Sequence, residues 1–557
     1  MGRLWRRFAI IGPFCDGTWF SRRTFWRNTL RSPWRSFSPP FGSVCAESRS
    51  SCRSPRRFEG IGSQRLSHRL RRGSMQRPRL CWGWVFLALG STWAAGERVT
   101  LYRDEWGVPH IYAQTEEGVA YGLGWAQAED RLEQLLKNYR LAAGTMAEAF
   151  GPEWVEHDWQ QRLAGHERVC RQRYRTLPAE VRRLIEAYQQ GVKDYMARHP
   201  QDVPSWAPHI EPWQAVALGR LIIFGWPIGL AMRELERRGE VALPFSSNQW
   251  AVRPERTTLG CAILLIDPHI PWDGPFRFYE FRAHGGRFHL SGFGPVGIPL
   301  LGLGHNEFLA WAATTPGGPD TADIYVEEVN PNNPLQYRYE GQWREMKVRK
   351  EVIRVKGQAP IEREIHFTHH GPVLLREGNR AYALATPYLD QVHIATQLYR
   401  MCLARNLEEF RAAMAMNQFM QQNIMYADVE GNIFYVRTGR VPIRPQGFDF
   451  SQPVPGNTRR SEWLGLHPMG DLLQLLNPSR GYMQNCNIGP DTMLVDSPLR
   501  KEKYPSYIYG AEPPGYTNSR GRRAVELLER TKRMSLEDAF AIAVDCHADA
   551  AEAWKRA

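Results

Sequence analysis

The 557-residue sequence has few cysteines and none of the common hydrolase signatures. Nine cysteines are spread along the chain and none forms a Cys-x-x-Cys pair, so no zinc or redox motif is present and no disulfide can be assigned. Gly-x-Ser-x-Gly, Ser-x-x-Lys and His-Glu-x-x-His are also absent. Any hydrolytic chemistry would therefore need a nucleophile other than those that these motifs mark.

The excess of positive charge is confined to the N-terminal region. Residues 1–80 contain 18 Arg, no Lys and 3 acidic residues, a net +15, which leaves +13 minus +15, or −2, for the rest. The folded part therefore has no indication of a basic groove, and we expect no nucleic-acid partner for it. The Arg/Ser/Pro-rich leader is typical of disorder; a nucleic-acid-binding or targeting arm remains an alternative for it.

The segment 75–95 has the pattern of a signal peptide. A basic stretch at 75–79 precedes a mostly apolar run at 80–89 and small residues at Ala94-Ala95. That run is too short for a bilayer, which needs about 20 residues, so we expect no membrane span. We predict export to the periplasm or outside the cell, with residues 1–74 a basic disordered or untranslated extension.

The rest of the chain is predicted to be a globular mixture of helices and strands. Hydrophobic residues make up 43% of the sequence and aromatic residues 12%, which indicates a large buried core. Apolar spacing predicts a helix capped by Thr115, and further helices at 178–198 and 212–224. Ser535 is expected to cap a helix that continues to residue 557.

The central stretch Ser246-Ser247-Asn248-Gln249-Trp250 opens a predicted hairpin. A short strand is followed by a turn rich in Pro, Thr and Gly, and an apolar strand at 261–266 ends at Asp267-Pro268-His269. A serine at the start of a strand is most often structural. Ser-Asn-x-Trp followed about twenty residues later by Asp-Pro-His is much more specific.

Three further motifs accompany this hairpin. They are 124–131 (GWAQAEDR), 302–328 (GLGHNEFLAWAATTPGGPDTADIYVEE) and 421–435 (QQNIMYADVEGNIFY). Together with the hairpin they resemble the penicillin acylase family of N-terminal nucleophile hydrolases over residues 97 to 557. The β chains of that family usually extend further than this sequence does.

The resemblance implies an α+β fold, a four-layer αββα sandwich, in which the precursor cleaves itself between Ser246 and Ser247. It implies a mainly helical α chain at 96–235, a linker at 236–246 and a β chain at 247–557, held together as a heterodimer. Ser247 would then be the nucleophile and its freed α-amine the base. An α-amine suits this role because its pKa is about 7.7–8.0.

The resemblance also assigns the surrounding residues. Thr315 would provide a backbone N–H and Asn423 a side-chain amide for the oxyanion, while Arg444 would brace the site. His269 would be a polar group near the amine; because no carboxylate at a familiar spacing orients it, we do not expect a Ser–His triad. Expected apolar acyl-pocket residues are Ile270, Ile298 and Leu301. Expected ligands of a structural calcium ion are Asp320, the Ala322 carbonyl, Asp323 and Glu234, with no cofactor needed for the chemistry.

These assignments predict an amidohydrolase acting on linear amides (EC 3.5.1.-). The expected substrate is an acylated small molecule, an acyl-homoserine lactone or a penicillin. One alternative is a cephalosporin or glutaryl-type side-chain acylase. Another is an unprocessed, inactive relative that only binds acylated ligands.

Overall fold

The computed structural model describes residues 8–11, 97–236, 246–315, 320–510, 512–548 and 551–556. The predicted signal peptide and most of the predicted linker lie outside these residues. Within the described part, no helix is both long and apolar enough to cross a bilayer, and all five described cysteines are unpaired.

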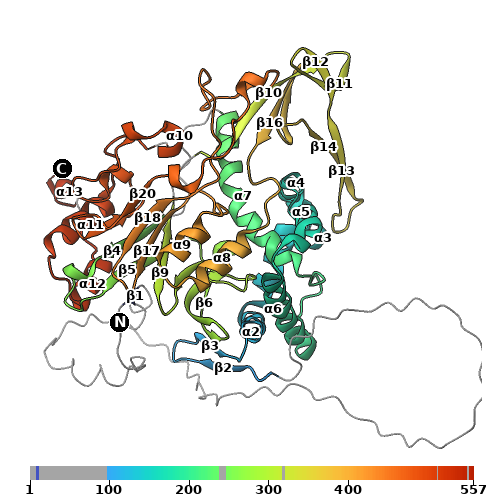
Figure 1. Ribbon diagram of the computed structural model, residues 1–557. Coiled ribbons are helices and arrows are strands. Elements are labelled where there is room, and N and C mark those ends of the chain that lie inside the picture. Colours follow the sequence, from blue (N-terminus) through green and yellow to red (C-terminus); the bar gives the residue numbers. More distant parts are fainter. Residues whose placement is uncertain are drawn as a thin grey trace, which may run out of the picture.

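Helices cluster in three regions of the molecule (Figure 1). The N-terminal group is α2 (Glu116–Ala143), α3 (Met146–Phe150), α4 (Val155–Ala164), α5 (His166–Arg173), α6 (Ala179–Arg198) and α7 (Trp213–Glu236). A central pair is α8 (Ile394–Leu403) and α9 (Leu407–Met414). The C-terminal group is α10 (Ser506–Tyr509), α11 (Ser519–Arg530), α12 (Leu536–Ala543) and α13 (Ala551–Arg556).

The largest sheet has the strand order β2-β3-β6-β7-β8-β9-β17-β18-β20. Its strands are β2 (Thr100–Arg103), β3 (Pro109–Tyr112), β6 (Phe278–Gly285), β7 (Phe288–Pro295), β8 (Leu303–His305), β9 (Leu309–Thr314), β17 (Asn423–Asp428), β18 (Ile433–Arg437) and β20 (Gln474–Leu476). A smaller sheet has the order β1-β5-β4-β21 and consists of β1 (Phe8–Ile11), β5 (Ala262–His269), β4 (Ser246–Val252) and β21 (Tyr482–Asn485). Strands β4 and β5 pack against β9 and β17, so the two sheets share one core.

A separate lobe is made of strands only. It contains β10 (Asp323–Asn330), β11 (Asn333–Tyr339), β12 (Gln342–Glu345), β15 (Val373–Glu377), β16 (Arg380–Ala385) and β19 (Val454–Pro455), with the ribbon β13 (Lys347–Ile353) and β14 (Ile361–Phe367) beside them. Figure 1 shows this lobe at the opposite end of the molecule from α11 and α12.

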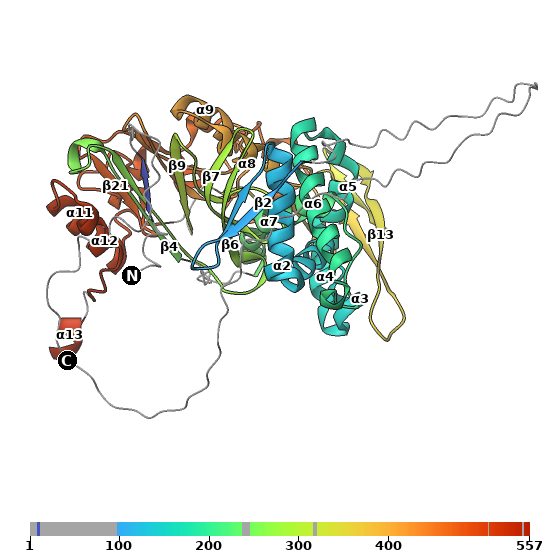
Figure 2. The ribbon, with the colours of Figure 1, turned by 90° about the horizontal axis from the view of Figure 1, so that it is seen from below.

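Helices lie against the outer side of each of the two core sheets. Phe410 of α9 packs on Trp311 of β9, with ring centroids 6.3 Å apart, and α11 contacts β21. Figure 2 shows α11 and α12 beside the smaller sheet, which contains β4 and β21. Helices α2 and α6 lie on the other side of the molecule, near the β2 edge of the large sheet. The fold is therefore a mixed helix-and-sheet fold, as predicted.

The helix α2 is specified by its sequence at both ends. The Thr115 hydroxyl accepts a hydrogen bond from the Gly118 N–H at 3.0 Å, and Gly144 ends the helix in the left-handed conformation at φ 63°. Glycines also bring α2 and α6 close together, because a Cβ at Gly124 would lie 2.1 Å from the Tyr188 carbonyl oxygen. This helical pair forms a rigid support next to the large sheet.

Two predicted helix limits were wrong. The predicted helix at 212–224 continues to Glu236 as α7. The helix capped by Ser535 has the expected capping box but ends at Ala543 rather than continuing to residue 557. Asp545 pairs with Arg523 of α11 at 3.0 Å and accepts the His547 N–H at 3.1 Å, so the chain turns away after that point.

Candidate active site

The hairpin that contains Ser247 forms as predicted. Strands β4 and β5 pair antiparallel, with Ser247 opposite Pro268 and Ser246 opposite His269. Ser247 is 3% exposed. Its hydroxyl donates to the carbonyl oxygen of Ser246 at 2.5 Å, so the hydroxyl oxygen lies next to the peptide bond that precedes it.

Two residues from distant parts of the chain hold Ser247 in place. The Ser247 N–H donates to Asn487 Oδ1 at 2.8 Å. Arg520, near the start of α11, donates to the Ser247 carbonyl at 3.0 Å, to Asn248 Oδ1 at 2.6 Å and to Asn487 Oδ1 at 2.8 Å. Asn487 has a positive φ of 63°, a conformation in which Asn is among the most frequent non-glycine residues. The serine is thus fixed through its backbone on both sides.

Asn423 begins β17 and lies opposite Thr314 of β9. Its Nδ2 donates to the Thr314 carbonyl at 3.3 Å, and its Oδ1 accepts from Tyr435 at 2.7 Å and Arg437 at 3.0 Å. An atom that accepts two hydrogen bonds must be the amide oxygen. The amide nitrogen is therefore on the other side and faces the Thr314–Thr315 segment. Asn423 is fully buried, next to the cavity rather than in its lining.

A cavity of about 120 Å³ lies beside Ser247. Ser247, Thr315 and Gln422 are its polar lining residues. The remaining lining residues are Gly219, Ile222, Ile223 and Trp226 of α7, Ile394 and Leu398 of α8, Ala313 of β9, and Pro268, Ile270, Phe276, Phe278, Pro295, Ile298, Gly302, Leu303, Phe419 and Met420. None of these side chains is charged, so the cavity suits an uncharged apolar group.

Two of the three predicted pocket residues, Ile270 and Ile298, line this cavity. The third, Leu301, is not among the residues that line it. Leu301 is 0% exposed and packs in the main core, whereas its neighbours Gly302 and Leu303 line the cavity. Residues 296–302 form an irregular segment between β7 and β8, so no strand or helix period in the sequence tells which of its side chains faces the cavity.

His269 has the orienting carboxylate that we did not expect. Its Nε2 lies 3.1 Å from Asp267 Oδ2, and its Nδ1 lies 3.1 Å from the hydroxyl of Ser246. The sequence contains a sign of this contact: Asp267 and His269 are two residues apart, and such residues in a strand point to the same face. The histidine nevertheless contacts Ser246 and not Ser247, so these contacts do not form a Ser–His triad on the expected nucleophile.

Comparison with known proteins identifies the family. The sequence model described as Penicillin amidase matches residues 98–557. The chain belongs to the penicillin amidase family. The resemblance inferred from the motifs is therefore confirmed.

Individual relatives of this penicillin amidase family member are distant. Penicillin acylase 2 proenzyme from Pseudomonas sp. (strain SE83) is 27% identical over 518 residues, which cover 80% of this chain and 64% of the relative. Acyl-homoserine lactone acylase PvdQ from Pseudomonas fluorescens (strain Pf0-1) is 28% identical over 389 residues, 61% of this chain and 50% of the relative. The chain thus spans about half to two thirds of the length of these relatives.

Among solved structures, a thermostable penicillin G acylase from Alcaligenes faecalis is similar to part of this family member. The TM-score is 0.45 and the sequence identity 31%, over 53% of this chain and 51% of that one.

The four predicted metal ligands of this family member lie in the neighbourhood of Arg444. Among the described residues, Glu234, Asp320 and Asp323 do not form a group whose ligand atoms all lie within 4.8 Å of one another. Burial, with the nearby Asp323 and Asp320 carboxylates, raises the pKa of Glu234 to about 9, and Glu234 Oε1 is a buried atom with no hydrogen-bond partner. Burial likewise raises the pKa of Asp323 to about 6, although Arg444 opposes the shift. Ala322, which lies between the two aspartates in the sequence, is 1% exposed.

Arg444 contacts these acids rather than the serine. Its Nη2 lies 2.8 Å from Asp320 Oδ2, 2.6 Å from Asp323 Oδ1 and 3.5 Å from the Ala322 carbonyl oxygen. The buried arginine that contacts the Asn423 amide is Arg437, which pairs with Glu512 at 2.7 Å. That Arg444 braces the site stays a prediction, since its ion pairs are with Asp320 and with Asp323 at the start of β10.

Sequence reasoning missed several residues of this site. Gln249 and Asp267 lie within the quoted motif, and Gln249 Nε2 donates to the Asn423 carbonyl at 2.9 Å. Asn487 and Arg520 had no local signal, because they reach Ser247 from 240 and 273 residues away. Such partners can be identified only from the three-dimensional structure.

Proposed function

We propose that the chain is a self-processing acylase that hydrolyses the amide bond of an acylated small molecule through Ser247. The observation that carries the proposal is the 2.5 Å contact between the Ser247 hydroxyl and the Ser246 carbonyl oxygen. Membership of the penicillin amidase family supports it.

Processing begins with attack of Ser247 Oγ on the carbonyl carbon of Ser246. The new C–O bond replaces the C–N bond, and the hydroxyl proton passes to the departing nitrogen, which becomes the α-amine of Ser247. Water then hydrolyses the resulting ester, leaving a carboxylate on Ser246 and restoring the hydroxyl. The His269 ring lies next to this bond, 3.1 Å from the Ser246 hydroxyl and 3.1 Å from Asp267.

Acyl transfer uses the same hydroxyl on a substrate amide. The freed amine takes the hydroxyl proton and returns it to the leaving amine, and water then releases the acyl group. The Thr315 N–H and the Asn423 amide stabilise the oxyanion, and the loss of one such donor typically lowers the rate by a hundred- to a thousandfold. Asn423 is supported for this role because Tyr435 and Arg437 fix the direction of its amide.

The cavity indicates the acyl group. About 120 Å³ is close to the roughly 150 Å³ cavity that binds benzene in an engineered protein, so a single ring or a short alkyl chain fits. None of the described residues that line the cavity is charged, which disfavours a glutaryl group because its carboxylate would be buried without a partner. An uncharged acyl chain, as in penicillins with an aromatic side chain or short acyl-homoserine lactones, is favoured over the glutaryl alternative.

After cleavage, the segments before and after Ser247 are expected to stay together as a heterodimer. Asn138 and Tyr139 of α2 donate to the carbonyls of Val296 and Gly297, each at 2.9 Å, and Gln127 accepts the Gly297 N–H at 2.9 Å. All of these bonds are buried. We propose that the two sheets and their outer helices form the four-layer αββα arrangement of an N-terminal nucleophile hydrolase.

We also propose a structural calcium ion at Glu234, Asp320, Asp323 and the Ala322 carbonyl. The donors fit this ion because all are oxygens and because Glu234 Oε1 is buried without a partner. The ion would supply positive charge to a crowded group of acids and join α7 to β10. Arg444, which now neutralises both aspartates, would remain beside it.

Intact mass of the purified protein tests the proposal. Wild type should contain two chains that separate at the 246/247 bond, Ser247→Ala should remain one chain, and Ser246→Ala is the matched control that keeps the nucleophile. Processed protein should hydrolyse phenylacetyl or short acyl amides and not glutaryl amides. A single wild-type chain without activity would support the alternative of an inactive relative that only binds ligands.

A further inference from the structure

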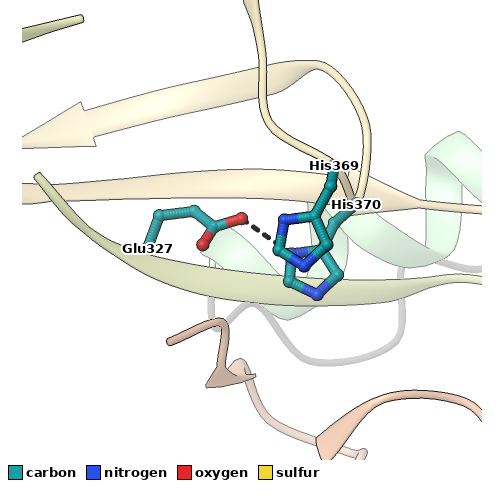
Figure 3. A group of neighbouring side chains, drawn as sticks. All are labelled: Glu327, His369 and His370. Carbon is teal, nitrogen blue, oxygen red and sulfur yellow. Dashed lines mark hydrogen bonds and ion pairs between the residues drawn. The ribbon is translucent and has the colours of Figure 1, made fainter. Parts of the chain in front are cut away.

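A second group of titratable side chains lies in the strand lobe, away from Ser247. Glu327 belongs to β10, His369 and His370 belong to the turn between β14 and β15, and Glu462 follows β19 in the chain. Figure 3 shows the two imidazoles side by side with the Glu327 carboxylate directed at one of them. One ligand atom each from Glu327, His369 and His370 lies within 4.8 Å of the other two.

The two ring nitrogens of His370 face different carboxylates. Nδ1 is 2.7 Å from Glu327 Oε1, and Nε2 is 3.2 Å from Glu462 Oε1. A neutral imidazole has one N–H. An imidazolium would donate one N–H to each carboxylate. In a neutral ring that donates Nδ1–H to Glu327, a cation between Nε2 and the Glu462 oxygen would take the place of the second proton.

His369 directs its ring at the same oxygen. Its Nε2 is 2.9 Å from Glu462 Oε1, while Nδ1 is 3.1 Å from the Tyr337 hydroxyl, which can accept the Nδ1–H. Two imidazole nitrogens and one carboxylate oxygen therefore converge. The distance to the Glu462 oxygen is 2.9 Å from His369 Nε2 and 3.2 Å from His370 Nε2. Ligand atoms around a tetrahedral ion with bonds of about 2.0–2.1 Å are roughly 3.3 Å apart.

The surroundings hold these groups in position. Tyr325 stacks on the His370 ring with centroids 3.6 Å apart. Glu327 is 0% exposed, its Oε2 has no hydrogen-bond partner, and a Cβ at Gly456 would lie 2.4 Å from that atom. The glycine therefore leaves the space that the carboxylate occupies. Throughout the described part of the chain, no Lys or Arg lies within 4.0 Å of either carboxylate, so the histidines are their charge partners.

We propose that this cluster binds one divalent transition-metal ion, with Zn²⁺ the best match, through Nε2 of His369, Nε2 of His370 and Oε1 of Glu462. Glu327 orients His370 by accepting its Nδ1–H, an arrangement common among metal-binding histidines. Two imidazoles favour zinc over calcium, which prefers oxygen ligands. The His369 and Glu462 side chains are 27% and 29% exposed, so solvent can supply the ion and complete its coordination.

This site is independent of the chemistry at Ser247. The ion would join the turn between β14 and β15 to the segment that follows β19, and so brace the lobe. The proposed calcium ligand Asp323 lies four residues before Glu327 on the same strand, about 13 Å away at roughly 3.3 Å per residue. The two sites can therefore be occupied separately.

Titration of the full-length protein with ZnCl₂ tests the site. The protein is stripped with EDTA and dialysed into excess CaCl₂, which keeps the oxygen site filled, and binding is followed by calorimetry. CoCl₂ is titrated in parallel, because imidazole-bound Co²⁺ absorbs visible light. We expect one equivalent per chain, and at least tenfold weaker binding for Glu462→Gln and for His369→Asn.

The matched control is His366→Asn. His366 lies in the same lobe beside Glu364 at 3.5 Å but outside the cluster, so its loss should leave zinc binding unchanged. The proposal is overturned if wild type takes up no stoichiometric zinc, which would mean that protons alone hold the cluster together. It is also overturned if Glu462→Gln and His369→Asn bind zinc as wild type does.

Discussion

Replacing Arg520 tests how the active serine is positioned. This side chain makes three hydrogen bonds, to the Ser247 carbonyl, Asn248 Oδ1 and Asn487 Oδ1, at 2.6 to 3.0 Å. A hydrogen bond from a charged donor contributes about 1.5–3 kcal/mol. If about 2–3 kcal/mol of this acts on the transition state, Arg520→Ala should slow both self-cleavage and acyl transfer roughly 30- to 150-fold.

The same substitution should also change the pH dependence of hydrolysis. Arg520 NH2 and the Ser247 nitrogen both contact Asn487 Oδ1 at 2.8 Å, so the guanidinium lies within about 6 Å of the future α-amine, a range in which like charges shift a pKa. Its positive charge disfavours the ammonium form and lowers the amine pKa below the usual 7.7–8.0. Removing Arg520 should therefore move the acidic limb of the kcat/KM profile to higher pH.

The assay follows precursor loss by intact mass and hydrolysis of a chromogenic anilide between pH 5 and pH 9. Arg520→Lys, which keeps the charge but loses the forked geometry, should retain the pH profile better than the rate. Arg523→Ala is the control on the same helix, because Arg523 pairs with Asp545 and Glu526 instead. Wild-type processing and an unshifted profile in Arg520→Ala would refute this reasoning, as would an equal loss in Arg523→Ala.

Three further substitutions test other parts of the site. Asn487→Asp places a carboxylate on the amine, so the acidic limb of kcat/KM should move to higher pH; an unchanged profile would mean that the amine does not lie there. Ala313→Leu fills part of the acyl cavity and should lower kcat/KM for phenylacetyl amides more than for acetyl amides, as a substrate panel would measure; equal losses would place the acyl group elsewhere. Glu234→Gln should abolish the rise in Tm that CaCl₂ gives over EGTA in wild type, whereas an undiminished rise would exclude the proposed ion site.

Elements whose signals are local were predicted well from the sequence. The hairpin of β4 and β5 follows from alternating and then continuous apolar residues, and α2 follows from its Thr115 cap and apolar spacing. Helix ends were less accurate, because α7 and α12 end where contacts with other elements decide, such as the Arg523–Asp545 pair after α12. Local patterns do not contain those contacts.

The site was only partly predictable for the same reason. Ser247, Thr315 and Ile298 share one cavity, and motif resemblance located them because short segments carry them. Leu301 lies in the core and not in the cavity lining, because the sequence does not tell which apolar side chain of an irregular segment faces the cavity. Arg520 was not anticipated, since a single arginine at the start of a helix gives no sign of a contact made 273 residues away.

The position of Asn487 and Arg520 late in the chain has a consequence for biosynthesis. Ser247 emerges from the ribosome long before the two side chains that hold its backbone. During that interval neither side chain is present to hold the serine, so the proposed self-cleavage would not begin on the nascent chain. Activation would then act as a quality check, since only a chain that has folded its distant segments together can switch itself on.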